Sequence, residues 1–275
     1  MKKGLFLAGI CLLAAGVGMS WIGRAMGGAT QAEVRIFGQS IQVFCGPKMW
    51  SVDSGWESDW ERSSVELDEL DAFDTIDIDV DLGDITIQAG DRYGLELDWW
   101  GSGYELAYAN EAGKLEIWSR EVGFGGLSAD GWGGEITVTV PYDQLLKELT
   151  VDSDLGDITI TQVDVETADM TLDLGSLSGD ELSVSRSLTV DADLGEVALS
   201  GNLTGETVIT ADLGSVLLML DAPKDRYSYD LQVDLGDISV DGTKFQETVT
   251  GGNGENYIEV EASLGDITIQ FSGEN

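Results

Sequence analysis

Residues 151–160 read Val-Asp-Ser-Asp-Leu-Gly-Asp-Ile-Thr-Ile, and variants of this phrase return along most of the chain. The central Leu-Gly pair occurs in seven copies, six of them preceded by aspartate. The leucines are Leu82, Leu155, Leu174, Leu194, Leu213, Leu235 and Leu264. From the second to the sixth copy they lie 19, 20, 19 and 22 residues apart. A period near twenty is typical of stacked repeats, in which one rung is too small to bury its own apolar face.

Four positions around each leucine are apolar in nearly every copy. They lie two and four residues before it and three and five residues after it, as in Ile78, Val80, Ile85 and Ile87. This alternation predicts a half-buried strand on each side of the Leu-Gly pair. The phase slips by one residue across the pair, so we expect a corner there, with leucine inward on one side and Ile or Val inward on the other. Glycine suits a corner because it accepts positive φ.

The sequence therefore predicts an all-β protein, a single-stranded β-solenoid of about 20-residue rungs with a looser third side. Equivalent leucines would stack about 4.8 Å apart as internal ladders. The first and second leucines are 73 residues apart, and the chain between them does not repeat. Alternating stretches at 95–97, 114–118 and 135–140 predict that this insert is a β-meander.

The composition is strongly acidic. The 275 residues include 14 basic and 51 acidic side chains and no histidine, for a net charge of −37. Such a surface repels nucleic acid and anionic headgroups, so we expect no nucleic-acid partner. A hydrophobic content of 43% is too high for a disordered acidic chain. The lack of histidine removes the commonest general base and metal ligand.

The N-terminus carries a membrane signal. Met1-Lys2-Lys3 precede an uncharged, mostly apolar run from Gly4 to Gly23, which ends at Arg24. Twenty helical residues span roughly the 30 Å hydrocarbon core, and the lysines favour a cytoplasmic N-terminus. We expect a single-pass helix in the cytoplasmic membrane with the C-terminal domain outside. The competing interpretation is a signal cleaved near residues 25–27, which would give a secreted protein.

Four segments follow from these patterns. Residues 1–27 are the transmembrane anchor or signal segment, 28–70 an acidic, tryptophan-containing juxtamembrane linker or cap, 71–272 the repeat domain and 273–275 a tail. Residues 34–37 and 41–44 alternate weakly, which favours one short hairpin. Cys11 falls in the apolar run, so Cys45 has no partner outside it and no internal disulfide framework is expected.

Carboxylates mark both sides of each corner. In stacked rungs they would form columns, and like charges at strand spacing raise pKa values or recruit cations. The candidate Ca²⁺ ligands are Asp81, Asp84, Asp154, Asp157, Asp234 and Asp237. The alternative is that these side chains accept hydrogen bonds from backbone N–H groups of the corner. Serine replaces aspartate in some copies, which favours the alternative because serine is a poor Ca²⁺ ligand. We therefore predict no firm metal site and no cofactor.

Tryptophan is concentrated before the main repeats. Seven of the eight lie between Trp50 and Trp132. The candidate binding face comprises Trp99, Trp100, Trp118 and Trp132, where exposed rings would contact a glycan or a partner chain. The alternative is that the rings cover the open end of the solenoid, whose first rung would otherwise expose apolar side chains.

Several motifs together resemble a known family. They are residues 73–78 (Phe-Asp-Thr-Ile-Asp-Ile), residues 82–87 (Leu-Gly-Asp-Ile-Thr-Ile), the strand end Val138-Thr139-Val140-Pro141 and the Leu-Gly-Asp repeats. Over residues 70–272 the chain resembles the bacterial "putative adhesin" family of β-strand-repeat proteins, a domain of unknown function. The resemblance implies a membrane-tethered or exported solenoid on the bacterial cell envelope and supplies no catalytic residues. The extra tryptophans and the acidic surface depart from the family pattern.

Function is less constrained than fold. We expect a non-enzymatic, extracytoplasmic surface module that displays a rigid anionic face to an envelope protein or glycan. A glycan- or cell-wall-binding module is the first alternative, and an acid-dependent carbohydrate-active enzyme is the second, because paired carboxylates alone can hydrolyse glycosides. Against the enzyme, the acids occupy the same corner of every rung and so mark the repeat rather than one site.

Overall fold

The computed structural model describes residues 31–36, 39–44, 62–68, 70–101, 104–121 and 133–272. The chain forms two compact units, residues 1–59 and 60–275. In the first unit, β1 (Gln31–Ile36) and β2 (Gln39–Phe44) pair as an antiparallel hairpin, as predicted. The expected anchor or signal segment at 1–27 lies outside the described residues. The described segments include no helix long and apolar enough to cross a membrane.

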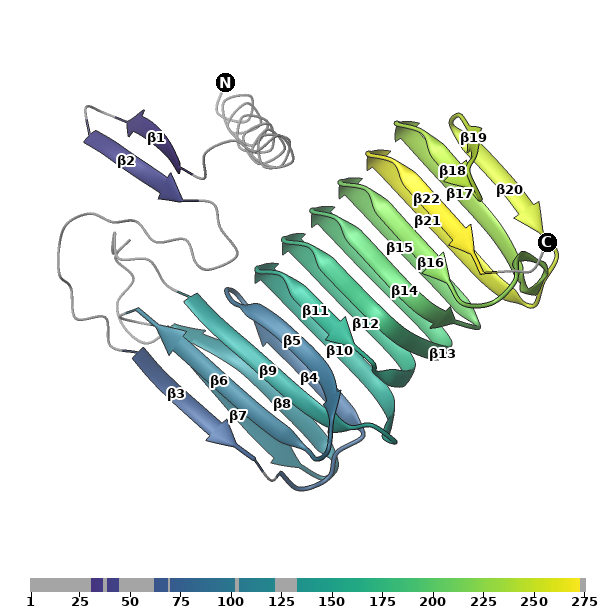
Figure 1. Cartoon of the computed structure of the whole chain (residues 1–275). Helices are drawn as coiled ribbons and strands as arrows, with labels where there is room; N and C mark the ends of the chain where they lie inside the picture. The colour runs from purple at the N-terminus through teal and green to yellow at the C-terminus, as the bar shows by residue number, and fades with distance from the viewer. Residues whose placement is uncertain are drawn as a thin grey trace. The chain divides into compact units, whose positions relative to one another are not determined.

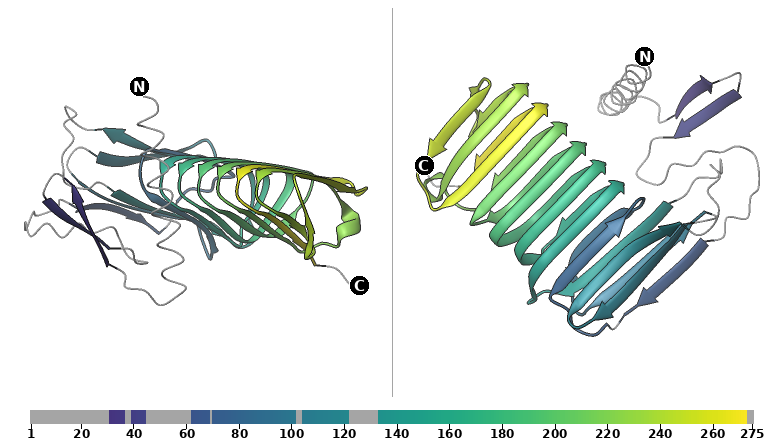
Figure 2. Two further views of the ribbon diagram at one scale, coloured as in Figure 1. Left: turned by 90° about the horizontal axis from the view of Figure 1, so that it is seen from above. Right: turned by 180° about the vertical axis from the view of Figure 1, so that it is seen from behind.

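The second unit is a twenty-stranded sheet that folds back on itself into two facing layers (Figures 1 and 2). The first layer contains, in spatial order, β7 (Tyr104–Glu111), β8 (Lys114–Glu121), β4 (Thr75–Val80), β10 (Leu145–Leu155), β12 (Asp164–Leu174), the end of β13 (Leu177–Leu194), β15 (Glu206–Leu213), β21 (Asn256–Leu264), β17 (Tyr227–Leu235) and β20 (Thr248–Gly252).

The second layer faces the first. It contains, in spatial order, β3 (Arg62–Leu67), β6 (Gly94–Trp100), β9 (Gly133–Pro141), β5 (Asp84–Gly90), β11 (Ile158–Thr161), the start of β13, β14 (Val197–Leu203), β16 (Val216–Leu220), β22 (Ile267–Phe271), β18 (Ile238–Val240) and β19 (Thr243–Phe245). A 3-10 turn, η1 (Lys224–Arg226), precedes β17.

Each central rung crosses from one layer to the other at a Leu-Gly corner and returns along a short third side. The third side is built from strand ends, in which Val165 pairs with Val184 and Val184 pairs with Leu203. Two of the return corners use left-handed residues other than glycine, Gln162 at φ 57° and Glu181 at φ 52°. The predicted looser third side is thus present, and β13 runs through a whole rung as one 18-residue strand.

The predicted inward positions form the core. All four apolar positions around the leucines are buried in all seven copies, and they stack in register, as Val151 on Met170 and Ile158 on Leu177. Burial of these side chains between the layers is the main force that holds the stack together, because each rung alone is too thin to exclude water. The all-β, solenoid-like architecture predicted from the repeats is confirmed.

The prediction for the leucines themselves is wrong. Leu155, Leu174, Leu235 and Leu264 are exposed, and Leu82, Leu194 and Leu213 are partly exposed. Inward and outward side chains alternate up to the residue before each leucine, and the alternation breaks at the leucine itself instead of beyond the glycine. The leucine therefore points outward, one residue earlier than the expected change of phase. The reason is the close approach of stacked glycine backbones, which occupies the inside of the corner and turns each leucine outward. The leucine ladder exists, but it runs along the outside.

The rungs do not stack in sequence order. The strands β4 and β5 lie between β8–β9 and β10–β11, and the late strands β21 and β22 lie between β15–β16 and β17–β18. At the N-terminal end the insert is only partly antiparallel: β7 pairs with β8, whereas β9 lies between β5 and β6 and pairs parallel with β5. The predicted β-meander is therefore wrong beyond the β7–β8 hairpin, because consecutive strands of the insert are not neighbours in the sheet. The edge strand β3 comes from the segment predicted as linker or cap and pairs with β6.

Candidate functional site: the Leu-Gly corners

The corners are fixed by a column of glycines. Six of the glycine N–H groups donate to the leucine carbonyl of the neighbouring rung, as from Gly156 to Leu174 at 3.0 Å and from Gly175 to Leu194 at 3.0 Å. A Cβ added to Gly175 would lie 1.8 Å from the carbonyl oxygen of Gly156, and φ of Gly175 is +155°. No side chain fits at that distance. Glycine is therefore required here by stacking as well as by backbone conformation.

A column of acids and serines follows the glycines, and it satisfies the backbone. The N–H of Asp157 donates to Asp84 Oδ1 at 3.0 Å, and the N–H of Ser176 donates to Asp157 Oδ1 at 2.8 Å. The N–H of Asp237 donates to Asp266 Oδ1 at 2.9 Å, and Ser176 and Ser215 accept in the same way. The alternative interpretation, backbone hydrogen bonding, is confirmed for this column. The bonds run between rungs rather than within one turn.

A second acidic column precedes the leucines and contains Asp81, Asp154, Asp173, Asp193, Asp212 and Asp234, with Ser263 between the last two. Partial burial raises the pKa of Asp154, and the neighbouring charges of Asp173 and Asp81 raise that pKa further. The pKa of Asp193 is raised in the same way by burial and then by Asp173 and Asp212. The direction of both shifts agrees with the predicted effect of like charges at strand spacing, which adds to the larger effect of burial.

Removing two of these charges is expected to stabilise the solenoid. Because the folded-state pKa values of Asp154 and Asp193 are raised, their ionised forms cost stability above those pKa values. The cost disappears as pH falls through the folded-state pKa values, which lie above 3.8. We expect Asp154→Asn combined with Asp193→Asn to raise the unfolding midpoint at pH 7 by about 2 °C, after allowance for solvent screening.

The check is thermal unfolding between pH 7 and pH 4. The gain should shrink toward pH 4 and in 1 M salt, where charges are screened. Asp164→Asn, at the exposed start of β12 outside the column, serves as control. A gain that is independent of pH would contradict the repulsion argument.

The six candidate Ca²⁺ ligands are divided between the two columns. Asp81 and Asp154 are neighbours in one column, and Asp84 and Asp157 in the other, whereas Asp234 and Asp237 lie in the rung at the far end. Asp81 Oδ2 accepts from Ser119 Oγ at 2.9 Å, and Asp237 Oδ2 pairs with Lys244 at 3.0 Å. Within the described ranges no group of three or more acidic or cysteine side chains is arranged to hold a metal. The Ca²⁺ hypothesis therefore gains no support from the geometry.

The candidate tryptophan face is divided between the layers. Trp99 and Trp100 lie on β6 in the second layer, and Trp118 lies on β8 in the first. Trp99 packs against the core, Trp100 lies over Gly133, and the Arg120 guanidinium stacks 5.2 Å from the ring of Trp118. Trp132 lies outside the described residues. Inward packing of Trp99 at this end agrees with the capping interpretation for that ring.

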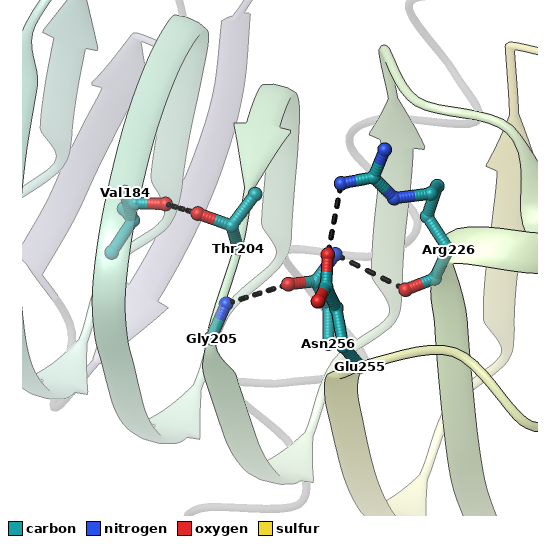
Figure 3. A network of polar contacts seen from close by, with 6 residues as sticks. All are labelled: Val184, Thr204, Gly205, Arg226, Glu255 and Asn256. Carbon is teal, nitrogen blue, oxygen red and sulfur yellow. Dashed lines mark hydrogen bonds and ion pairs between the residues drawn. The ribbon is translucent and has the colours of Figure 1, made fainter.

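A buried amide that the sequence analysis did not single out holds the inserted rung (Figure 3). Asn256 begins β21 and is only 6% exposed. Its Oδ1 accepts from the Gly205 N–H at 3.0 Å, and its Nδ2 donates to the Arg226 carbonyl at 3.1 Å. Beside it, Arg226 pairs with Glu255 at 2.9 Å. Asn256 thus joins the rungs on both sides of it, and no periodic signal in the sequence marks this position.

No curated protein matches this chain. Among solved structures, it is similar to a "putative cell adhesion protein" from Clostridium sporogenes ATCC 15579, with 15% identity, a TM-score of 0.47, and 78% of this chain and 100% of that chain covered. It is also similar to a "putative adhesin" from Bacteroides fragilis NCTC 9343, with 12% identity, a TM-score of 0.33, and 77% and 97% of the two chains covered.

A family model gives the assignment. The model described as Toastrack DUF4097 matches residues 73–218, which is more than half of the chain. The matched residues begin at the buried Phe73 and continue through five of the seven Leu-Gly corners, so the model covers most of the motifs behind the resemblance. The resemblance to a β-strand-repeat family of unknown function is confirmed: the chain belongs to the Toastrack DUF4097 family.

Proposed function

We propose that this protein is a non-enzymatic interaction module, anchored in the bacterial membrane by its N-terminal segment, with the repeats outside. The observation that carries the proposal is the repetition of surface chemistry. Every corner presents the same leucine between the same two kinds of polar side chain, so the surface consists of long parallel columns. Such a surface is suited to extended contact with a partner and has no unique centre.

The acids do not favour catalysis. A glycosidase needs two carboxyls in different environments, one kept protonated and one ionised. Here the carboxyls of the column after the glycines accept backbone hydrogen bonds, and those of the column before the leucines repeat along the stack. Neither column singles out one pair.

The tryptophans favour a glycan-binding face less than the sequence suggested. A stacking platform needs neighbouring rings on one surface. Trp100 and Trp118 lie in opposite layers, and Trp99 points inward against the core. A partner that contacts the repeats is therefore the better supported proposal.

The location of the repeats can be tested in intact bacterial cells that express the full-length chain. With Cys11 and Cys45 replaced by serine, a new cysteine at the exposed Ser178 of β13 would be the reporter. We expect Ser178→Cys to react with a membrane-impermeant maleimide in intact cells, because the repeats lie outside. Labelling that begins only after lysis would contradict the proposal.

A matched variant checks that the maleimide labelling is measured on folded protein. Val184 is buried in the short third side. Val184→Cys should stay unlabelled in intact cells and react only after denaturation.

A further inference from the structure

The leucines at the corners form a continuous stripe on the outside of the stack, in which four are exposed and Leu194 and Leu213 are partly exposed. We define the leucine stripe as Leu155, Leu174, Leu194, Leu213, Leu264 and Leu235, in spatial order. Seven large apolar side chains are exposed among the described residues, and four of them lie in this stripe, at 44–65% exposure. Five intervals at strand spacing make the stripe about 24 Å long. It ends beside Leu82, which packs against the core.

The stripe is rigid. Each leucine carbonyl accepts the glycine N–H of the next rung, from 2.9 Å at Leu155 to 3.1 Å at Leu235. The corner itself depends on the glycine backbone, and the leucine side chain points away from it. A polar residue at the leucine position would meet the same backbone needs and avoid exposing apolar surface. An ordered apolar row that folding does not require marks an interaction site.

Carboxylates line both edges of the stripe. The residue before each leucine is aspartate at every corner of the stripe except Ser263, and beyond the glycines lie Asp157, Glu196, Asp266 and Asp237. A complementary partner must therefore be apolar along one line and basic on both sides of it. Anionic lipid would be repelled, and a second copy of this chain would set acids against acids in either orientation.

We propose that the leucine stripe docks a cationic amphipathic helix of a partner protein. The apolar face of such a helix would lie along the leucines, and Lys or Arg at its borders would reach the two rows of carboxylates. At 1.5 Å rise per residue, about 16 helical residues match the length of the stripe. This assignment rests on the proposed function, since it names the partner class for the same display surface.

The probe is a fluorescent helical peptide of about 18 leucines and lysines, with leucine on one face only. The control is a peptide of identical composition in shuffled order. Full-length protein is titrated into each, and anisotropy is recorded. We expect saturable binding of the amphipathic peptide and at least tenfold weaker binding of the shuffled one. Equal binding of the two peptides would show that the interaction depends on net charge alone, and it would overturn the proposal.

Variants locate the binding surface. Leu174→Ser, Leu194→Ser and Leu213→Ser together should weaken binding at least tenfold. Met219→Ser and Leu145→Ser remove exposed apolar side chains elsewhere and should leave binding unchanged. Asp173→Asn with Asp212→Asn keeps the leucines and should weaken binding in low salt. Wild-type affinity in the triple leucine variant, once its unfolding midpoint shows that it is folded, would overturn the proposal.

Two further outcomes separate the alternatives. Concentration-dependent dimers that the triple leucine variant abolishes would assign the stripe to a second copy and overturn the helix assignment. If Ser178→Cys is labelled in intact cells but the peptide does not bind, this inference fails and the proposed function stands. If the peptide binds but labelling requires lysis, the location outside the membrane is wrong and the docking surface stands.

Discussion

Replacement of Gly175 by alanine is expected to destabilise the repeat unit by more than about 4 kcal/mol, well beyond the effect of an ordinary substitution. The added Cβ would lie 1.8 Å from the Gly156 carbonyl oxygen, a backbone atom that cannot rotate away. The rungs would have to separate, which would break the glycine-to-leucine hydrogen bonds at 3.0 Å on both sides of Gly175. Because repeats are stabilised by contact with their neighbours, separation at one corner weakens the whole stack.

Gly242 provides the matched control. It also has positive φ, +74°, but an added Cβ would meet nothing within 4 Å. Gly242→Ala should cost only the conformational penalty of about 1 kcal/mol. Urea unfolding followed by circular dichroism gives both midpoints. Similar small losses in the two variants would show that the corner backbones are not in close contact.

The second large effect is expected from Asn256→Ala. The change leaves the Gly205 N–H and the Arg226 carbonyl without their partner in a site that is 6% exposed. Each unsatisfied buried group costs about 1–3 kcal/mol, so the two together should cost roughly 2–6 kcal/mol. The loss should be greatest in β21 and β22, because Asn256 begins the rung that they form.

Hydrogen exchange is the informative measurement for this variant. Amides of β21 and β22 should exchange faster in Asn256→Ala, while those of β10 and β12 keep their protection. Asn202→Ala, at an exposed asparagine of β14, should change neither the midpoint nor the exchange pattern. Uniform loss of protection along the solenoid would contradict a local role for Asn256.

The interior of the fold could be predicted from sequence because it is periodic. Ser153, Ala192, Ala211 and Ala262 occupy the same inward position, and a small residue there is informative only when the copies are aligned. The direction of the leucines could not be predicted, because it depends on how closely two glycine backbones approach across rungs. That approach leaves no trace in apolar alternation, which continues through the leucine as if it were inward.

The order of the rungs also could not be predicted from the sequence. Aligned repeats show which residues are equivalent but not which copies are neighbours. The position of β21 depends on Asn256, Gly205 and Arg226, which meet across three rungs and belong to no repeated motif. The candidate site could be predicted from the sequence in part. The acidic columns follow from the alignment, whereas their division into backbone acceptors and mutually repelling charges required the geometry.

The interleaved rung constrains how the protein can be assembled. A ribosome or export channel releases residues 206–240 before residues 256–271, yet the later segment separates β15 from β17. Winding therefore cannot simply advance from the first rung to the last as the polypeptide emerges. The rung formed by β17 and β18 must remain unpaired on one side until β21 and β22 have emerged and can pair with it.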